Sequence, residues 1–265
     1  MSRVDNKVAI VTGGGRGIGE AACKLLAQAG AKLVVTDIDD DAANSVAKSI
    51  IDEGGEAIAI KHDVSSESAW QNVMDQTIES FGRLDVLVNN AGIVVPVGCK
   101  AKSIEEFLCR DISLDDWKAI QAVNYDGTFI GTRNAIRLME HNEQRGSIIN
   151  ISSIAVKGNS GSTVPYSASK GGVSVFSRAA AVECRNMGFK VRINTILPGA
   201  IDSVINIPMD EERKQELHKK WVYGYPIEIA KGVLFFASDD SQFITAAELV
   251  IDGGLSASFF NDSGK

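Results

Sequence analysis

Short apolar runs alternate with segments of helical periodicity along most of the chain. The runs are rich in β-branched residues, as expected for strands that are buried on both faces of a parallel sheet. In the segments between them, apolar residues recur three and four positions apart, which places them on one face of a helix. The predicted strands are 7–12, 32–36, 57–61, 84–88, 146–153 and 191–197. The predicted helices include 20–29, 42–53, 67–81 and 226–237, one capped by Ser113 and Asp116, and one that carries Tyr166.

This alternation of strands and helices predicts an α/β protein whose parallel strands are joined by right-handed crossovers. The chain has 265 residues, 45% of them hydrophobic, which suits one domain with a sizeable core. We expect residues 1–265 to form that single domain, with a substrate flap at about 200–225 and a C-terminal tail at about 258–265.

A glycine-rich segment follows the first predicted strand and leads directly into a helix. It reads Thr-Gly-Gly-Gly-Arg-Gly-Ile-Gly over residues 12–19 and includes Gly13, Arg16, Gly17, Ile18 and Gly19. Glycines let backbone amides approach phosphate oxygens, and a helix N-terminus favours their negative charge. A plain turn is the alternative, but the strand and helix on either side favour a dinucleotide. The expected fold is therefore a Rossmann-type, doubly wound parallel sheet flanked by helices.

Asp37 ends the second predicted strand and is the main candidate for choosing the coenzyme. An acid at this position accepts hydrogen bonds from a ribose hydroxyl pair and repels a 2′-phosphate. Its alternative role is the N-cap of helix 42–53. Arg16 argues in the opposite direction, because a guanidinium there could meet a 2′-phosphate. We give Asp37 more weight and predict NAD rather than NADP.

Asp63 and Val64 follow the third predicted strand and are further candidates for coenzyme contacts. We expect Asp63 either to touch the adenine or to cap helix 67–81.

Tyr166 and Lys170 lie four residues apart, so on a helix they share one face. A nearby ammonium favours the phenolate, and we therefore expect Lys170 to lower the pKa of Tyr166 toward neutrality. Such a phenol could exchange protons near neutral pH. Alone, this spacing is weak evidence, because a surface Tyr and a solvated Lys would look the same.

Four motifs together resemble the short-chain dehydrogenase/reductase family, from Lys7 to about Ala257. They are Thr12-Gly13-x-x-x-Gly17-x-Gly19, Asn89-Asn90-Ala91-Gly92, Ser153 and Tyr166-x-x-x-Lys170. Their order and spacing make the combination highly specific.

The resemblance implies a role for each catalytic candidate. Tyr166 exchanges the proton with the substrate oxygen, and Lys170 lowers the Tyr pKa and binds the nicotinamide ribose. Ser153 holds the substrate oxygen; Ser152 is its competitor, but the family places its Ser thirteen residues before the Tyr. Asn124 holds a water that joins Lys170 to solvent, unless its side chain simply bonds to backbone.

The resemblance also implies coenzyme contacts in the later loops. They are Asn90, Ala91, Gly92, Pro198, Gly199, Ile201 and Ser203. Ser203 stands where a Thr is usual, and the hydroxyl is retained. Segment 243–254 is similar to the family's last strand, with Ala246 where Gly is usual.

We expect the substrate to be a secondary alcohol or ketone, and two further segments of the sequence indicate which kind. Residues 62–67 and 175–185 are similar to bacterial hydroxysteroid and cyclic-alcohol dehydrogenases, and apolar residues near the expected mouth suit a hydrophobic ring. These are Ile154, Val156, Val94, Val95 and Trp221. The alternatives are an NADPH-dependent carbonyl or 3-oxoacyl reductase, supported by Arg16, and a non-catalytic dinucleotide sensor. Residues 94–111 form an unusually long connection, which is expected to shape the substrate site, contact a subunit or have no function.

Composition and charge limit the kinds of partner that the protein is expected to bind. The net charge is −7 and the pI about 5.1, so nucleic acid and anionic membranes are poor candidates. Four scattered cysteines and three scattered histidines give no metal-like grouping, so no metal is expected. Free thiols, no signal-like segment and no long apolar span indicate a cytoplasmic protein. The family resemblance implies a homo-oligomer, a dimer or tetramer, in which the Tyr166 helix packs against a second subunit.

Overall fold

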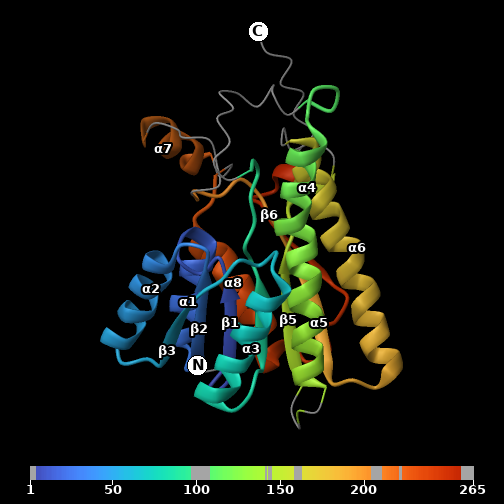
Figure 1. The fold of residues 1–265 in the computed structure, drawn as a ribbon. Helices are drawn as coiled ribbons and strands as arrows, with labels where there is room; N and C mark the ends of the chain where they lie inside the picture. Colours follow the sequence, from blue (N-terminus) through green and yellow to red (C-terminus); the bar gives the residue numbers. More distant parts are fainter. Residues whose placement is uncertain are drawn as a thin grey trace.

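A seven-stranded parallel sheet forms the centre of the molecule (Figure 1). The computed structural model describes residues 4–96, 108–140, 142, 145–157, 163–203, 211–220 and 223–257. The strands follow the order β3-β2-β1-β4-β5-β6-β7, so the order reverses beside β1. Their bounds are β1 Val8–Thr12, β2 Lys32–Asp37, β3 Ala57–Lys61, β4 Val86–Asn89, β5 Gly146–Ile151, β6 Val191–Pro198 and β7 Glu248–Ile251. The predicted doubly wound α/β fold is confirmed.

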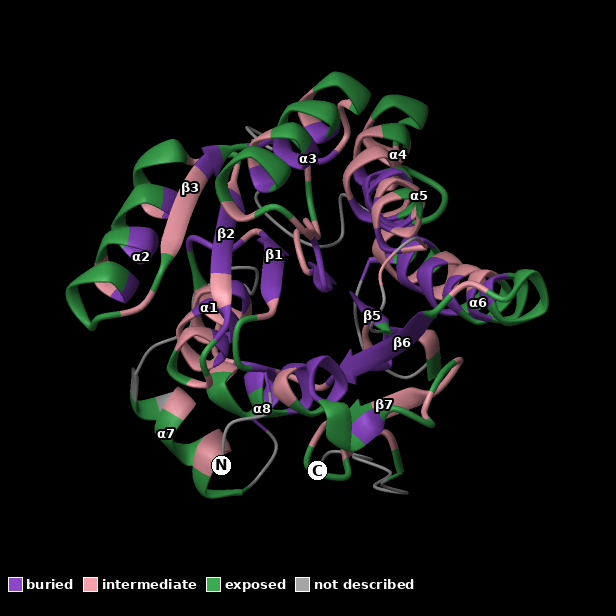
Figure 2. Ribbon diagram, turned by 90° about the horizontal axis from the view of Figure 1, so that it is seen from below, coloured by how far each residue is buried: buried purple, intermediate pink, exposed green. Residues whose placement is uncertain are grey.

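Helices connect the strands and cover both faces of the sheet (Figure 2). They are α1 Gly17–Gln28, α2 Asp40–Asp52, α3 Glu67–Phe81, α4 Leu114–Gln121, α5 Gly127–Met139, α6 Val164–Met187, α7 Glu211–Lys219 and α8 Pro226–Ala237. A π-helical turn, η2 (Ala122–Asp126), joins α4 to α5. The short 3₁₀ turns of the described residues are η3 Ile154–Lys157, η4 Asp239–Ser241 and η5 Leu255–Ala257. Among described residues, no helix is long and apolar enough to cross a membrane.

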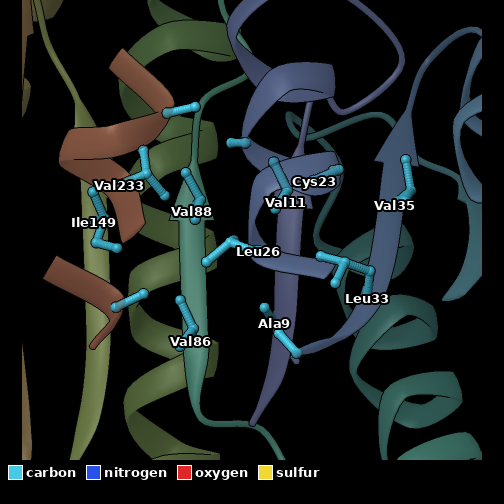
Figure 3. Packing of buried hydrophobic residues seen from close by; sticks show 14 of the residues in the cluster. Ala9, Val11, Cys23, Leu26, Leu33, Val35, Val86, Val88, Ile149 and Val233 are labelled. Carbon is cyan, nitrogen blue, oxygen red and sulfur yellow. The ribbon is translucent and has the colours of Figure 1, made fainter. Parts of the chain in front are cut away.

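Two hydrophobic cores lie on opposite faces of the sheet. In β1, Ala9 and Val11 face the core formed with α1, α2 and α8, whereas Ile10 faces the core formed with α3, α5 and α6. Strands β2 and β4 alternate in the same way (Figure 3). This explains why the strands read as continuous apolar runs: both sets of side chains are withdrawn from water.

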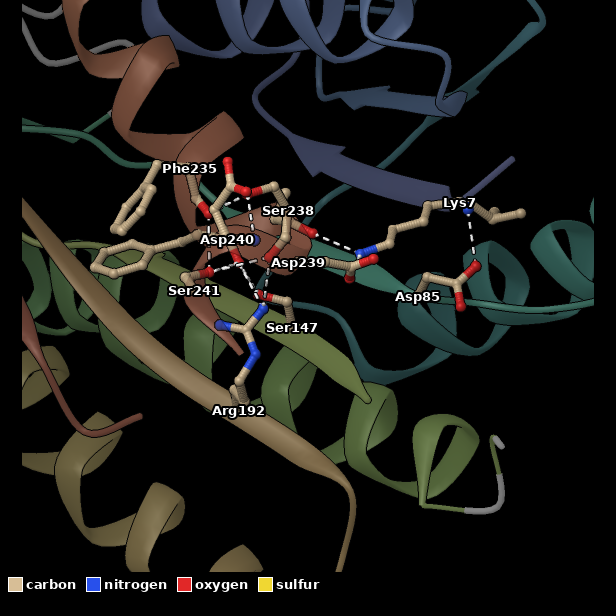
Figure 4. A network of polar contacts seen from close by, with 12 residues as sticks. Lys7, Asp85, Ser147, Arg192, Phe235, Ser238, Asp239, Asp240 and Ser241 are labelled. Carbon is tan, nitrogen blue, oxygen red and sulfur yellow. Dashed lines mark hydrogen bonds and ion pairs between the residues drawn. The ribbon is translucent and has the colours of Figure 1, made fainter. Parts of the chain in front are cut away.

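Polar contacts close the amino-terminal edge of the sheet (Figure 4). Arg192, near the start of β6, donates to the Phe236 carbonyl at 2.8 Å, and Lys7 binds the carboxylate of Asp239 at 2.7 Å. The Ser147 hydroxyl also donates to the Phe236 carbonyl, at 2.7 Å. Together with a bond from the Lys7 ammonium to the Ala237 carbonyl at 3.0 Å, these contacts satisfy two carbonyls at the C-terminal end of α8. They leave the opposite, carboxyl edge of the sheet for ligands.

Several predicted boundaries differ from those observed. Helix α1 begins at Gly17, three residues before the prediction, because the glycine loop itself enters the helix. The predicted fifth strand ends at Ile151, and Ser153 lies two residues beyond it. The Ser113 hydroxyl accepts from the Asp116 amide at 3.0 Å, and it also donates to the Asp116 carboxylate at 2.7 Å.

Some predictions fall wholly or partly outside the described residues. The long connection 94–111 is described only at its two ends, and the tail 258–265 is not described. Trp221 also lies outside the described part of the chain. In the expected flap, helix α7 is an element that the sequence did not predict.

Candidate active site

The glycine loop brings the end of β1 close to the start of α1. Gly13 has a φ of 61°, in the left-handed region that favours glycine. A Cβ at Gly19 would lie 2.0 Å from the Gly13 carbonyl oxygen, which excludes any side chain there. The loop leads into the N-terminus of α1, where the helix favours the negative charge of phosphates, and so it fits a dinucleotide.

Thr12 ties this loop to the neighbouring strand β4. Its hydroxyl accepts hydrogen bonds from the backbone amides of Asn90 and Ala91, both at 3.0 Å. In return, the Asn90 side chain donates to the carbonyls of Thr12 and Gly13, at 2.8 and 3.1 Å. The sequence interpretation left Thr12 without a role, because its partners are nearly eighty residues away.

Asp37 stands at the end of β2, beside the glycine loop. One of its oxygens accepts from the Gly15 amide and the other from the Asp39 amide, both at 3.0 Å. The helix cap is Asp39, whose carboxylate accepts from the Ala42 amide at 3.1 Å. Capping of α2 therefore falls to Asp39, and Asp37 is held facing the loop. Arg16 forms an ion pair with Asp39.

Asp63 and Val64 lie at the carboxyl end of β3. The Asp63 carboxylate accepts from the Ser65 amide at 2.9 Å, while Ser66 is the cap of α3. Asp63 is exposed, and Val64 is buried with its carbonyl held by the Trp70 indole N–H at 2.9 Å. The predicted cap at Asp63 is thus wrong, and its outer oxygen edge stays accessible.

The loop after β6 reaches back to the glycine loop. A Cβ at Gly17 would lie 3.3 Å from the Ser203 Cβ, so the two loops lie side by side. Pro198 ends β6, and the Gly199 amide donates to the Ile251 carbonyl at 2.9 Å. Ile201 is 5% exposed and packs into the core beneath. It anchors the loop and presents Ser203 beside the helix N-terminus.

Ser152 and Ser153 have different surroundings. Ser152 is buried, and its hydroxyl donates to the Lys170 carbonyl at 2.9 Å. Ser153 is half-buried, with a hydroxyl that accepts from the Ala155 amide and interacts with the side chain of Tyr166. The geometry therefore places Ser153, not Ser152, beside the phenol.

Tyr166 and Lys170 lie on α6 with the Lys170 ammonium 5.8 Å from the centre of the phenol ring. Lys170 is 3% exposed and donates to the Ile151 carbonyl at 2.9 Å. Burial lowers the pKa of Lys170 to about 8. For Tyr166 the predicted direction is wrong: burial raises its pKa, and the Ser153 hydrogen bond only opposes that rise.

Asn124 is fully buried in the π-helical turn η2. Its side chain accepts from the Ile93 amide at 2.8 Å and donates to the Ile93 carbonyl at 2.9 Å and the Ser169 hydroxyl at 3.0 Å. A Cβ at Gly92 would lie 3.2 Å from the Asn124 amide oxygen and 3.3 Å from the Lys170 ammonium. Asn124 thus bonds to backbone, as the alternative reading held, and does so next to Lys170.

These groups meet at the carboxyl edge of the sheet, where ligands of open α/β folds bind. A family model described as Enoyl-(Acyl carrier protein) reductase matches residues 13–256. The chain belongs to the short-chain dehydrogenase/reductase family. It is an NAD(P)-dependent dehydrogenase that acts on alcohols.

Curated relatives match over nearly the full chain. The 2,5-dichloro-2,5-cyclohexadiene-1,4-diol dehydrogenase LinX of Sphingobium indicum is 38% identical, over 96% of this chain and 98% of the relative. The NADP-dependent (R)-specific alcohol dehydrogenase of Lentilactobacillus kefiri is 39% identical over the same shares. The 3-beta-hydroxysteroid dehydrogenase of Comamonas testosteroni is 35% identical, over 96% and 97%.

A solved structure agrees with the fold. The short-chain type dehydrogenase/reductase from Mycobacterium marinum is 29% identical and superposes with a TM-score of 0.82, covering 97% of this chain and 98% of that one. The resemblance stated from the four motifs is confirmed.

Proposed function

We propose that this dehydrogenase interconverts a hydrophobic cyclic secondary alcohol, of the size class of ring alcohols and steroids, and its ketone, with NAD as coenzyme. The observation that carries the reaction is the cluster of Ser153, Tyr166 and Lys170 at the carboxyl edge of the sheet. The residues fit a dinucleotide, because glycines let the loop backbone fold closely at the N-terminus of α1, where phosphates are favoured. When bound, the nicotinamide accepts or returns the hydride.

The side chains then divide the remaining work. Tyr166 takes the proton from the substrate hydroxyl during oxidation and returns it during reduction. Ser153, beside the phenol, orients the substrate oxygen. The Lys170 ammonium is held against the Ile151 carbonyl, where we assign it a contact with the nicotinamide ribose and an attraction for the phenolate that works against the effect of burial.

Asn124 is assigned a supporting role next to Lys170. Its amide fixes the backbone of Ile93 from both sides. These two hydrogen bonds hold the turn after β4 in place. We place Asn124 on the route by which a proton passes from Lys170 to solvent.

The preference for NAD rests on Asp37. Its carboxylate is fixed by two backbone amides at the end of β2, where it would accept from a ribose hydroxyl pair and repel a 2′-phosphate. Gly13, Gly17, Ile18 and Gly19 would contact the pyrophosphate, and Asp63 with Val64 the adenine. The nicotinamide side falls to Asn90, Ala91, Gly92, Pro198, Gly199, Ile201 and Ser203.

The ring substrate rests on apolar residues near the site and on relatives. Val95, a few residues after β4, is 40% exposed, whereas Ile154, at the start of η3, is 5% exposed. LinX is named for a cyclic diol and the Comamonas enzyme for a steroid.

A reducing, cytoplasmic location is supported by Cys23, Cys109 and Cys184, which are free thiols.

A carbonyl reductase that uses NADPH is the second candidate. It is favoured by Arg16 beside the glycine loop and by the NADP dependence named for the Lentilactobacillus relative. Asp37→Ala separates the two: an NAD enzyme loses its discrimination against NADP, whereas an NADPH enzyme keeps its preference unchanged.

The test is oxidation of a panel of cyclic and steroidal secondary alcohols with NAD and NADP, by wild type beside Tyr166→Phe. Removing the phenol hydroxyl should lower turnover roughly a hundredfold to ten-thousandfold. NADH binding, followed by fluorescence, should persist in the variant. Turnover confined to acyl thioesters or sugars would contradict the ring substrate, and undiminished turnover by Tyr166→Phe would contradict the mechanism.

A further inference from the structure

We propose that Asp39 is a second determinant of coenzyme choice, which acts by engaging Arg16 and so withholding that guanidinium from a 2′-phosphate. The inference rests on the proposed NAD reaction and deepens it. Arg16 is the one feature of the glycine loop that favours NADP, and the structure gives its charge a partner.

The ion pair joins the glycine loop to the first turn of α2. Arg16 is the residue before α1, and its guanidinium contacts one carboxylate oxygen of Asp39. The other oxygen of Asp39 accepts from the Ala42 amide at 3.1 Å. The Asp39 carboxylate is therefore held in place by its work as a helix cap, and Arg16 meets an acceptor that is already positioned.

Asp37 and Asp39 form one connected arrangement. The Asp39 amide donates to one Asp37 oxygen at 3.0 Å, and the Gly15 amide donates to the other at 3.0 Å. A Cβ at Gly15 would lie 3.0 Å from the Asp37 carboxylate, so the loop and both acids are in close contact. A phosphate entering here would meet two carboxylates and a guanidinium that is already neutralised.

The expected size of the shift in coenzyme preference follows from the exposure of the Arg16–Asp39 ion pair to water. The side chains of Arg16 and Asp39 are 55% and 37% exposed, so water screens their attraction. We therefore expect the loss of the pair to shift coenzyme preference roughly twofold to fivefold, well short of a full reversal. Asp37 accounts for the larger part of the preference for NAD, because its carboxylate would still face the 2′-phosphate of NADP.

Asp39→Asn is the sharpest variant, since Asn caps helices as well as Asp does but carries no charge. Dissociation constants for NADH and NADPH are measured by fluorescence titration, together with kcat and KM for both oxidised coenzymes. The ratio of NADPH to NADH affinity should rise roughly twofold to fivefold. In Asp39→Asn with Arg16→Ala, the gain in NADPH affinity should disappear.

Asp40→Asn is the matched control. Asp40 is the next residue and an exposed acid of the same first turn, but its carboxylate contacts the Asn44 side chain, at 3.2 Å. This variant removes the same charge without touching Arg16, and its coenzyme ratio should stay unchanged.

Three results would overturn the inference: an unchanged ratio in Asp39→Asn, an equal shift in Asp40→Asn, or a gain that survives Arg16→Ala. Failure of the proposed function looks different. In that case wild type itself binds NADPH more tightly than NADH, or turns over no alcohol with NAD, whatever the variants do to the ratio.

Discussion

His62 lies between Asp37 and Asp63, the two acids that are candidates for contact with the adenosine half of the coenzyme. It is 2% exposed, shares a hydrogen bond of 3.0 Å with the Thr36 hydroxyl and meets the edge of the Trp70 ring at a centroid distance of 4.4 Å. Its backbone amide donates to the Asp37 carbonyl at 2.7 Å. His62 thereby joins the ends of β2 and β3 just below Asp37 and Asp63.

His62 should make folding sensitive to acid. Burial lowers its pKa from 6.5 to about 4, with Asp63 opposing the shift. Because the unfolded chain takes up this proton first, stability falls as the pH drops from about 6.5 toward 4. The full difference is about 3 kcal/mol. Thermal unfolding of wild type and His62→Phe, followed across this range, should show a shallower pH dependence in the variant.

Carboxylates titrate over the same range, so the difference between the two slopes is the readout. His62→Phe lacks the Thr36 hydrogen bond and starts less stable, which does not affect the comparison of slopes. Parallel pH profiles for the two proteins would contradict a neutral, buried His62.

The sequence could identify residues whose role is written in local spacing, and it failed where the role depends on distant partners. Gly19 and Tyr166 were identified because glycine loops and helical spacing are local patterns. Asp39 and Asp37 both precede α2, and only their hydrogen bonds assign the cap to one and the loop contact to the other. The pKa of Tyr166 was predicted in the wrong direction, because spacing says nothing about burial.

At the scale of elements, the turn before β7 retains a glycine-like conformation without a glycine. Ala246 has a φ of 61°, and its amide donates to the Ile193 carbonyl at 2.8 Å. A side chain in the left-handed region costs about 1 kcal/mol relative to glycine. Ala246, which stands where Gly is usual in the family, is therefore strained.

Ala246→Gly should therefore stabilise the protein by up to about 0.5 kcal/mol, because relief of strain exceeds the added freedom of the unfolded chain. Chemical denaturation measures the free energy of unfolding. Ala247→Gly is the control: it adds the same freedom to the unfolded chain and should destabilise by about 0.5–1 kcal/mol. Equal destabilisation by both variants would show that Ala246 is not strained.

Strands were predicted better than the elements near the site. Strands β1, β2, β4, β5 and β6 are buried along almost their whole length, so their apolar runs are unbroken and their bounds were found within two residues. Helix α7 was missed because its residues are almost all polar and no apolar stripe marks them. The π-helical turn at Asn124 was missed because its extra residue per turn leaves no local signature.

For the molecule as a whole, the outer face of α5 and α6 is apolar. Phe129, Val175 and Val182 are 41%, 60% and 41% exposed, and the Phe129 ring meets the Phe176 ring at 5.9 Å. Exposed apolar side chains on neighbouring helices are typical of an association site. The homo-oligomer, in which α6 packs against a second subunit, stays a prediction, and these side chains are where we expect the contact.

Val175→Asp should therefore lower the molar mass measured by light scattering, since a charge buried between subunits opposes association. Ile51→Asp is the control, because Ile51 is 53% exposed on α2, away from this face. Its molar mass should match that of wild type. An equal mass for all three proteins would remove α6 as the subunit contact.

The closeness of Gly17 and Ser203 has a consequence for how the chain is made. The first loop of the protein lies against the loop that follows β6, near the other end of the chain. On the ribosome, β1 to β4 can pair while the later strands are still being synthesised, but the dinucleotide cradle stays open on one side until β6 has emerged. Coenzyme therefore cannot assist the early steps of folding, and it stabilises the protein only once nearly all of the sheet is in place.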